Sequence, residues 1–194
     1  MKIEDVMTRR VVAARADSEL AHLARLMWDN DCGAVPVVDA EDKVVGIVTD
    51  RDICMGAHFS GLALREQRAS GCMGSEVLTC RPGDDVLPVV AAMARRQVRR
   101  IPVTDAAGRL VGLVAVGDLF AALAKAKAKE QKALGAALLA FLGAVTARPL
   151  REEVVPATPA KAKKVAKKAS APAKAEEKPA KNGARSKRRA KSAR

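Results

Sequence analysis

Two hydrophobic patterns alternate along the first 120 residues of the chain. After the polar segment ADSE, Leu20, Leu23 and Met27 recur at helical spacing, which predicts a helix. The β-branched runs AVPVVD and KVVGIVT follow, separated by the turn-rich tetrad AEDK, and predict a hairpin. With an early strand near residues 11–13 and a closing helix opened by DRDI, the pattern predicts strand, helix, strand, strand and helix.

The same pattern returns 66 residues later without a gap. This offset pairs Met7 with Met73, Asp17 with Gly83, Met27 with Met93, Pro36 with Pro102, Asp39 with Asp105, Gly46 with Gly112 and Asp52 with Asp118. Because a gapless match of this length is improbable by chance, residues 1–120 are interpreted as two copies of one unit. Each copy, at roughly 60 residues, has little core of its own. We therefore expect the copies to pack sheet against sheet as a pseudo-twofold pair.

The chain is expected to divide into four segments. They are repeat 1 at 1–60, repeat 2 at 67–124, a helical extension at 125–147 and a basic tail at 148–194. The extension is rich in strong helix formers and is expected to continue the closing helix of the second repeat. The tail repeats Ala, Lys and Pro with almost no large apolar residue, which predicts disorder. The predicted fold class is thus α/β, more strictly α+β, with two repeats, a helix and a disordered tail.

Charge is spread unevenly along the sequence. Residues 1–120 carry 15 Lys and Arg against 17 Asp and Glu, whereas residues 148–194 carry 16 against 4. The overall charge of +13 therefore belongs to the C-terminal end. Any partner attracted by positive charge is expected to bind there.

Composition favours a cytoplasmic protein without a metal centre. The four cysteines form no Cys-x-x-Cys pair, and only two histidines could join them, which argues against a metal or disulfide framework. The N-terminus lacks the apolar segment of a signal peptide. The longest apolar stretch, residues 133–145, is shorter than the roughly 20 residues that cross a bilayer.

The segment VVGIVTDRDI carries the candidate chemistry. Gly46 lies in an apolar strand, Thr49 ends it, and Asp52 lies one turn into the next helix. A hydroxyl at a helix N-terminus can contact a phosphate, and a carboxylate can accept hydrogen bonds from both hydroxyls of a ribose. The same Thr and Asp could instead cap the helix. The second copy keeps Gly112 and Asp118 but has Ala115 in place of the hydroxyl.

The two copies resemble a tandem pair of CBS domains, the arrangement called a Bateman module. The segments that carry the resemblance are CGAVPVVDAEDKVVGIVTDRDI and VRRIPVTDAAGRLVGLVAVGDLF, and it covers about residues 5–120. It implies sheets that pair, clefts for AMP, ADP, ATP or S-adenosylmethionine, and assembly into homodimers. Many members regulate an attached enzyme, channel or transporter.

By the same resemblance, Thr49 is the phosphate hydroxyl and Asp52 the ribose carboxylate. The residues expected at the first cleft are Thr49, Asp52, Val12, Ala34, Val35 and Pro36, and those at the second are Asp118, Arg100, Ile101 and Pro102. Arg99 and Arg100 are candidates for contacting phosphate. The absent hydroxyl at Ala115 makes the second cleft the weaker candidate.

No residue pattern indicates catalysis. No Ser, Cys or Lys lies beside a recognisable general base, and no phosphate-cradling loop with Lys and Ser or Thr is present. The protein is therefore not expected to be an enzyme, and it needs no cofactor beyond a regulatory adenine nucleotide. The single Trp, Trp28, is expected to pack at a helix end.

The tail resembles the Lys/Ala/Pro-rich tails of linker histones in composition. Flexible cationic side chains neutralise phosphates without reading sequence, so the tail is expected to bind DNA or RNA and to give the protein a nucleoid association. The side chains expected to make these contacts are Lys163, Lys164, Lys167, Lys168, Lys187, Arg188, Arg189 and Lys191. The alternative for the tail is a solvated segment that binds nothing in particular.

Two functions of different classes follow from these patterns. In the first, the repeats sense an adenosine-containing ligand and the tail tethers them to nucleic acid. In the second, the protein is a chromatin-like, nucleic-acid-binding protein whose repeats serve only as a dimerisation scaffold. Thr49 and Asp52 favour the first function. The missing hydroxyl at Ala115 and the strongly basic tail favour the second.

Overall fold

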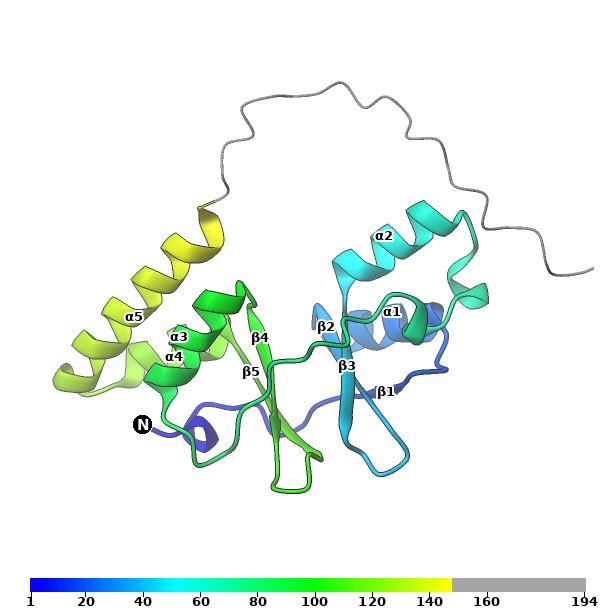
Figure 1. Cartoon of the computed structure of the whole chain (residues 1–194). Coiled ribbons are helices and arrows are strands. Elements are labelled where there is room, and N and C mark those ends of the chain that lie inside the picture. The colour runs from blue at the N-terminus through cyan, green and yellow to red at the C-terminus, as the bar shows by residue number, and fades with distance from the viewer. Residues whose placement is uncertain (148–194) are drawn as a thin grey trace, which may run out of the picture. The chain divides into compact units, whose positions relative to one another are not determined.

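A computed structural model describes residues 1–147 of the chain (Figure 1). In chain order its helices and strands are η1 (Ile3–Asp5), β1 (Ala14–Arg15), α1 (Leu20–Asp29), β2 (Ala34–Val38), β3 (Val44–Thr49), α2 (Asp50–Ser60), η2 (Leu64–Glu66), η3 (Ala69–Gly71), α3 (Val86–Arg96), β4 (Arg100–Thr104), β5 (Leu110–Ala115), α4 (Val116–Lys125) and α5 (Ala128–Thr146). The predicted α+β class with two repeats is confirmed, because a helix, a hairpin and a further helix recur in both halves. The predicted disorder of the tail concerns residues 148–194, which lie outside the described part of the chain.

Each repeat forms its own small sheet. In the first, β1 runs parallel to β2 and β2 runs antiparallel to β3, which gives the order β1-β2-β3. In the second, β4 and β5 form an antiparallel pair. A single parallel bridge between Cys80 and Val103 takes the place that β1 has in the first repeat.

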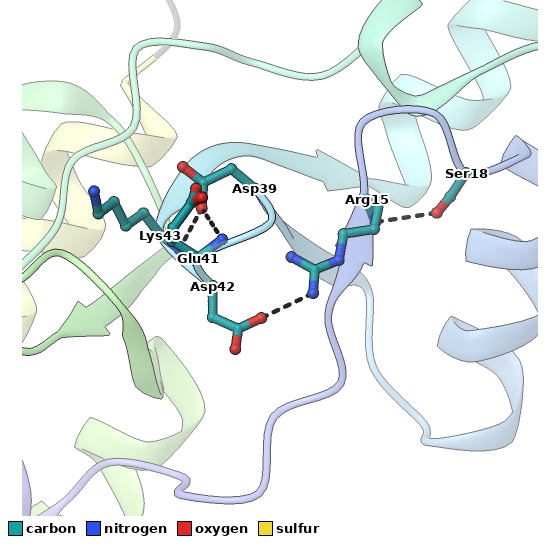
Figure 2. Close-up of polar contacts among 6 residues, drawn as sticks. All are labelled: Arg15, Ser18, Asp39, Glu41, Asp42 and Lys43. Atoms are coloured by element: carbon teal, nitrogen blue, oxygen red, sulfur yellow. Dashed lines mark hydrogen bonds and ion pairs between the residues drawn. The ribbon is translucent and has the colours of Figure 1, made fainter.

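An aspartate closes the hairpin between β2 and β3 (Figure 2). One carboxylate oxygen of Asp39 accepts hydrogen bonds from the backbone N–H of Glu41 at 3.1 Å and of Lys43 at 2.8 Å. Asp42 adopts a left-handed conformation with φ 61° and forms a salt bridge of 3.0 Å with Arg15. The tetrad that predicted a turn therefore forms one, which the preceding Asp39 and the ion pair with Arg15 stabilise.

The tips of the two hairpins bond to each other symmetrically. The N–H of Val44 donates to the carbonyl of Gly108 at 3.2 Å, and the N–H of Leu110 donates to the carbonyl of Asp42 at 3.0 Å. The 66-residue offset converts one of these bonds into the other. The two repeats are consequently related by an approximate twofold axis that passes between the hairpins.

A segment that precedes the first strand of each repeat pairs with the last strand of the other repeat. Thr8, from the N-terminal segment, exchanges two backbone hydrogen bonds of 2.9 Å with Leu113 on β5 of the second repeat. Gly74, which follows η3, exchanges bonds of 3.0 and 3.1 Å with Ile47 on β3 of the first repeat. In Figure 1 the N-terminus accordingly lies beside α3 and α4 rather than beside its own repeat.

Two glycines, one on β3 and one on β5, allow these exchanged segments to lie close to the strands. A Cβ added at Gly46 would lie 2.5 Å from the sulfur of Met73, and one added at Gly112 would lie 2.8 Å from the sulfur of Met7. Real Cβ atoms do not approach other atoms so closely. The glycines of the two repeated strands therefore provide room for a methionine from the opposite segment.

The apolar side chains form two core clusters, one in each repeat. The first is built from α1, β2 and β3 and includes Ala69 of η3. The second is built from α3, β4 and β5 and takes Ile3 from the N-terminal segment. The second cluster also contains Leu134, Leu138 and Phe141 of α5, which have 3%, 1% and 1% of their surface exposed.

The last helix folds back onto the second repeat. The chain leaves α4 at Lys125, adopts an extended conformation at Ala126 and starts α5 at Ala128. Near its C-terminal end, α5 is held by Gln97, whose side-chain amide donates to the carbonyl of Ala144 at 3.1 Å. α5 is therefore a separate helix that covers α3 and α4 rather than a continuation of α4.

Candidate functional site

Thr49 and Asp52 form a closed hydrogen-bonded cap where β3 meets α2. The N–H and the hydroxyl of Thr49 donate to Oδ2 of Asp52 at 2.8 and 2.7 Å, and the N–H of Asp52 donates to the Thr49 hydroxyl at 3.3 Å. The capping interpretation of these residues is thus confirmed. Both donors use Oδ2, so Oδ1 of Asp52 takes no part in the cap.

The second repeat keeps only half of this arrangement. The N–H of Ala115 donates to Oδ2 of Asp118 at 2.8 Å, which reproduces the backbone bond of the first cap. Ala115 has no hydroxyl, so one hydrogen bond to the carboxylate and one to the helix N–H are missing. Asp118 lies at the position that corresponds to Asp52, but less of its environment fixes its orientation.

The sheet register brings three further predicted residues to the first cap. Ala34 pairs with Thr49, Val35 with Val48, and Pro36 with the next residue inward along β3. Val35 is fully buried in the core of the first repeat, so only its backbone could face a ligand. Val12 lies two residues before β1 and packs against the same core cluster.

In the second repeat the corresponding strand is β4. Arg100 pairs with Ala115, and Ile101 and Pro102 pair with the two preceding residues of β5. Ile101 is buried in the second core, with 1% of its surface exposed. These residues therefore stand to Asp118 as the β2 residues stand to Asp52.

Arg100 also reaches across to the first repeat. A Cβ added at Gly33 would lie 2.8 Å from Nη2 of Arg100 and 3.1 Å from Oδ2 of Asp50. The N–H of Asp50 in turn donates to the carbonyl of Gly33 at 3.4 Å. The guanidinium of a second-repeat residue thus lies beside the start of α2, next to Thr49. Sequence reasoning assigned Arg100 to the second cleft, since the offset alone gives no sign of this contact.

A cavity of about 510 Å³ opens at this contact. Its lining residues are Ala24, Met27, Trp28, Asp31, Cys32, Gly33, Asp50, Ile53 and Arg100. Trp28 was expected to pack at a helix end, and that expectation is wrong, because 84% of its surface is exposed at the cavity. The periodicity of α1 could have indicated this, since Leu20, Leu23 and Met27 already form its buried face.

Asp52 lines a second hollow of about 520 Å³ on another side of α2. Residues between Leu62 and Cys72 form the opposite wall. Burial raises the pKa of the Cys72 thiol, and the negative charge of the Asp52 carboxylate raises it further. The Cys72 side chain is therefore a neutral thiol beside the carboxylate at neutral pH.

The sequence model of the CBS domain family matches this chain at residues 3–56 and 69–125, which correspond to the two repeats. The chain belongs to the CBS domain family. Among curated relatives, the CBS domain-containing protein YhcV of Bacillus subtilis is 32% identical over 117 residues, which cover 60% of this chain and 81% of YhcV. Hypoxic response protein 1 of Mycobacterium tuberculosis is 29% identical over 115 residues, or 59% of this chain and 80% of that protein.

Solved structures of CBS pairs share the fold. The CBS-domain protein ATU1752 of Agrobacterium tumefaciens superimposes with a TM-score of 0.57 at 29% identity, covering 63% of this chain and 98% of that one. The CBS pair of MJ0100, solved with 5′-methylthioadenosine and S-adenosyl-L-methionine, has a TM-score of 0.59 at 23% identity, with 66% and 98% covered. CBSX2, solved with AMP, has a TM-score of 0.56 at 22% identity, with 64% and 96% covered.

The predicted nucleic-acid contacts lie outside the described residues. They are Lys163, Lys164, Lys167, Lys168, Lys187, Arg188, Arg189 and Lys191. Within residues 1–147 no helix is long and apolar enough to cross a membrane. In that same part of the chain, no three His, Cys, Asp or Glu side chains gather closely enough to hold a metal ion.

Proposed function

We propose that the CBS pair is a non-enzymatic regulatory module that binds an adenosine-containing ligand at its first repeat. The observation that supports this best is the meeting of three groups at the N-terminal end of α2. The Asp52 carboxylate is held by Thr49 at 2.7 and 2.8 Å, and the Arg100 guanidinium lies beside Gly33, next to the same strand end. A ribose can reach Asp52 in its hollow, and Arg100 lines the separate cavity that begins at the same end of α2.

The three side chains take different roles in this proposal. Asp52 accepts hydrogen bonds from the ribose hydroxyls through Oδ1, the oxygen that the cap leaves unused. Thr49 orients Asp52, because its hydroxyl hydrogen is already donated to Oδ2. Arg100 supplies the positive charge for an anionic group of the ligand. Thr49 is thus a positioning residue for the carboxylate rather than the main contact of a phosphate.

The first cleft is proposed as the stronger of the two. Ala115 cannot orient Asp118 as Thr49 orients Asp52. The offset also places Val116 at the position of Asp50 and Arg99 at the position of Gly33. The second cleft therefore lacks the hydroxyl of Thr49 and the carboxylate of Asp50. It also has the large side chain of Arg99 in place of Gly33. Two of the structural neighbours carry adenosine ligands, which supports the class of ligand but not the choice of cleft.

The experiment is a calorimetric comparison of Asp52→Ala with Asp118→Ala. Ligands are first ranked by thermal shift with AMP, ADP, ATP, 5′-methylthioadenosine and S-adenosylmethionine, since binding to the folded state raises its stability. Loss of hydrogen bonds to the charged group in Asp52→Ala should weaken the best ligand by about 1.5–3 kcal/mol. Asp118→Ala should have the smaller effect. Equal impairment of both variants, or of neither, contradicts the assignment.

We further propose that a second copy of the chain covers the apolar side of α2. Phe59 and Met55 on α2, and Leu62 just after it, expose 80%, 37% and 51% of their surfaces. They also line the hollow at Asp52, so a second copy bound there would close that hollow over the ligand. Burying such side chains between copies gains about 25 cal/mol per Å² of apolar surface. Light scattering on residues 1–147 should report a dimer, and Phe59→Ser should dissociate it. A monomer at high micromolar concentration excludes this interface.

The tail is proposed to bind nucleic acid without reading sequence. Residues 148–194 carry 16 basic and 4 acidic side chains, whereas residues 121–147 carry only 4 and 1. If about six phosphates are neutralised, log K should fall with log salt with a slope near −5. Gel shifts at two salt concentrations, on the full chain and on residues 1–147, measure this slope.

The same gel shifts separate sensing from scaffolding. Retained binding by residues 1–147, or salt-insensitive binding by the full chain, contradicts a role for the tail. If the repeats are only a scaffold, no adenosine compound should shift the melting temperature. If they sense a ligand, the ligand should raise the melting temperature in the presence and absence of the tail.

A further inference from the structure

The turn after α3 carries four arginines within six residues. It reads RRQVRR over residues 95–100. The offset of 66 residues pairs it with the turn after α1, which reads DNDCGA over residues 29–34. We call the first segment the arginine turn and the second the acidic turn. One position of the repeated fold thus holds four basic side chains in one copy and two acidic side chains in the other.

The two turns have the same backbone geometry, so the fold requires neither charge. A left-handed residue occupies the same position in each, Asp31 with φ 47° and Gln97 with φ 52°. The next residue donates its N–H to a methionine carbonyl five residues earlier, at 3.0 Å from Cys32 and at 3.1 Å from Val98. Basic side chains near a helix C-terminus favour its dipole, but α1 ends without any in its last turn. Helix capping therefore does not account for the arginines.

Three of the arginines are available to a partner. Arg95, Arg96 and Arg99 are exposed, whereas Arg100 is only partly exposed. Among the described residues, 1–147, Arg95 and Arg99 take part in no salt bridge. Arg96 contacts Glu76 at 3.8 Å, and 65% and 91% of these two side chains are exposed. Such an exposed ion pair contributes little, so an anion can displace Glu76.

The arginine turn contacts the end of α5, after which the basic segment begins. The side-chain amide of Gln97 donates to the carbonyl of Ala144, in the last turn of α5, at 3.1 Å. α5 ends at Thr146, and residues 148–194, with 16 basic and 4 acidic side chains, follow it in the sequence. A polyanion bound by that segment is tethered to the chain that carries the arginine turn, which raises its effective concentration there.

The acidic turn of a second copy is a poorer partner for the arginine turn. Asp29 is already paired with Arg25 at 2.7 Å, so within residues 1–147 Asp31 is the one carboxylate of the acidic turn outside a salt bridge. Duplex nucleic acid carries one negative charge per about 1.7 Å of its axis. A guanidinium can bind a phosphate through two parallel hydrogen bonds. A row of phosphates therefore supplies a partner for each exposed arginine.

We infer that Arg95, Arg96 and Arg99 form a phosphate-binding surface on the second repeat for the nucleic acid that the tail is proposed to bind. Each arginine contacts a backbone phosphate and releases counterions, and none reads a base. The inference rests on the proposed function, because the chain must bind nucleic acid. It also assigns Arg99 to nucleic acid rather than to the phosphate of a bound nucleotide.

The test measures the binding of duplex DNA by the full chain between about 100 and 300 mM salt, where charges farther apart than roughly 10 Å are screened. The turn variant removes the three exposed charges of the turn: Arg95→Gln, Arg96→Gln and Arg99→Gln. It should flatten the slope of log K against log salt by about two to three, since each phosphate contact contributes about 0.9. Melting curves confirm that each variant is folded.

The matched control removes three exposed arginines outside the turn that form no salt bridge within residues 1–147: Arg10→Gln, Arg65→Gln and Arg81→Gln. The control should keep the slope of the wild type. Equal slopes in the turn variant and the control overturn the inference. It is also overturned if the turn variant keeps the slope but loses affinity for AMP, or keeps the slope but changes the oligomeric state in light scattering.

A tail variant tests the proposed function separately. It removes three charges of the tail: Lys187→Gln, Arg188→Gln and Arg189→Gln. A flatter slope in the tail variant with an unchanged slope in the turn variant supports the tail and overturns the arginine surface. The reverse result supports the arginine surface and contradicts the role of the tail. If the wild type binds no DNA, both proposals fail.

Discussion

The guanidinium of Arg100 occupies space that a side chain at Gly33 would need. The two residues belong to different repeats, and a Cβ at Gly33 would lie 2.8 Å from Nη2 of Arg100. The contact is made by the far end of a flexible side chain, which can move at little cost. A substitution at Gly33 should therefore change the position of one charge and leave the fold intact.

Gly33→Ala should weaken an adenosine ligand with an anionic group by up to about 1.5–3 kcal/mol, because Arg100 is displaced from it. The melting temperature should change little. Calorimetry and a melting curve measure the two effects. Gly83→Ala is the control, since a Cβ at Gly83 would meet no atom within 4 Å. A folded Gly33→Ala variant with unchanged affinity would show that Arg100 does not contact the ligand.

Gly46→Ala and Gly112→Ala should both destabilise the protein. Each added methyl group meets a methionine sulfur, at 2.5 and 2.8 Å, and a backbone oxygen of the exchanged segment, at 3.3 and 3.1 Å. Overpacking of this kind costs about 1–3 kcal/mol. Urea unfolding measures it. Gly117→Ala, where the Cβ has open space on α4, should instead be neutral or stabilise by about 0.5–1 kcal/mol.

Phe141→Ala should show that α5 is part of the second core. The side chain has 1% of its surface exposed, and removing a buried Phe costs about 3–5 kcal/mol. Leu139, on the same helix, is 72% exposed, so Leu139→Ala should change the free energy of unfolding by less than about 0.5 kcal/mol. Similar losses in the two variants would mean that α5 does not dock as described.

The cysteines should differ strongly in reactivity. Burial, together with the nearby Asp84 carboxylate, raises the pKa of the Cys80 thiol to about 12, whereas Cys54 is exposed on α2. The thiolate is the reactive form, so at pH 8 iodoacetamide should modify Cys54 rapidly and Cys80 only after unfolding. Raising the pH to 9 should leave Cys80 unmodified. Mass spectrometry of the digested protein checks this, and early modification of Cys80 would contradict its burial.

The repeated elements could be predicted because their signals are local. The spacing of Leu20, Leu23 and Met27 gives the buried face of α1. The tetrad AEDK and its counterpart AAGR, which ends at Arg109, give the turns. The cap at Thr49 and Asp52 could be predicted for the same reason. Such features depend on residues a few positions apart, where spacing along the chain fixes spacing in the fold.

Other features depend on contacts that spacing does not reveal. The break at Ala126 lies among good helix formers without Pro or Gly, and it is fixed by the docking of α5 on the second core. The pairings of Thr8 with Leu113 and of Arg100 with Gly33 join segments far apart in sequence. Tertiary packing decides such contacts, so they could be found only in the structure.

The exchange of segments between the repeats has an evolutionary consequence. Thr8 completes the edge of β5 and Gly74 completes the edge of β3, so neither copy contains all the strands that its own sheet uses. A single ancestral copy with this geometry would have left its edge strand unpaired, and a partner molecule could have covered that edge by the same exchange. Duplication and fusion would then join two swapped subunits in one chain, after which each half could diverge. The hydroxyl kept at Thr49 and replaced at Ala115 is a difference that such a fusion permits.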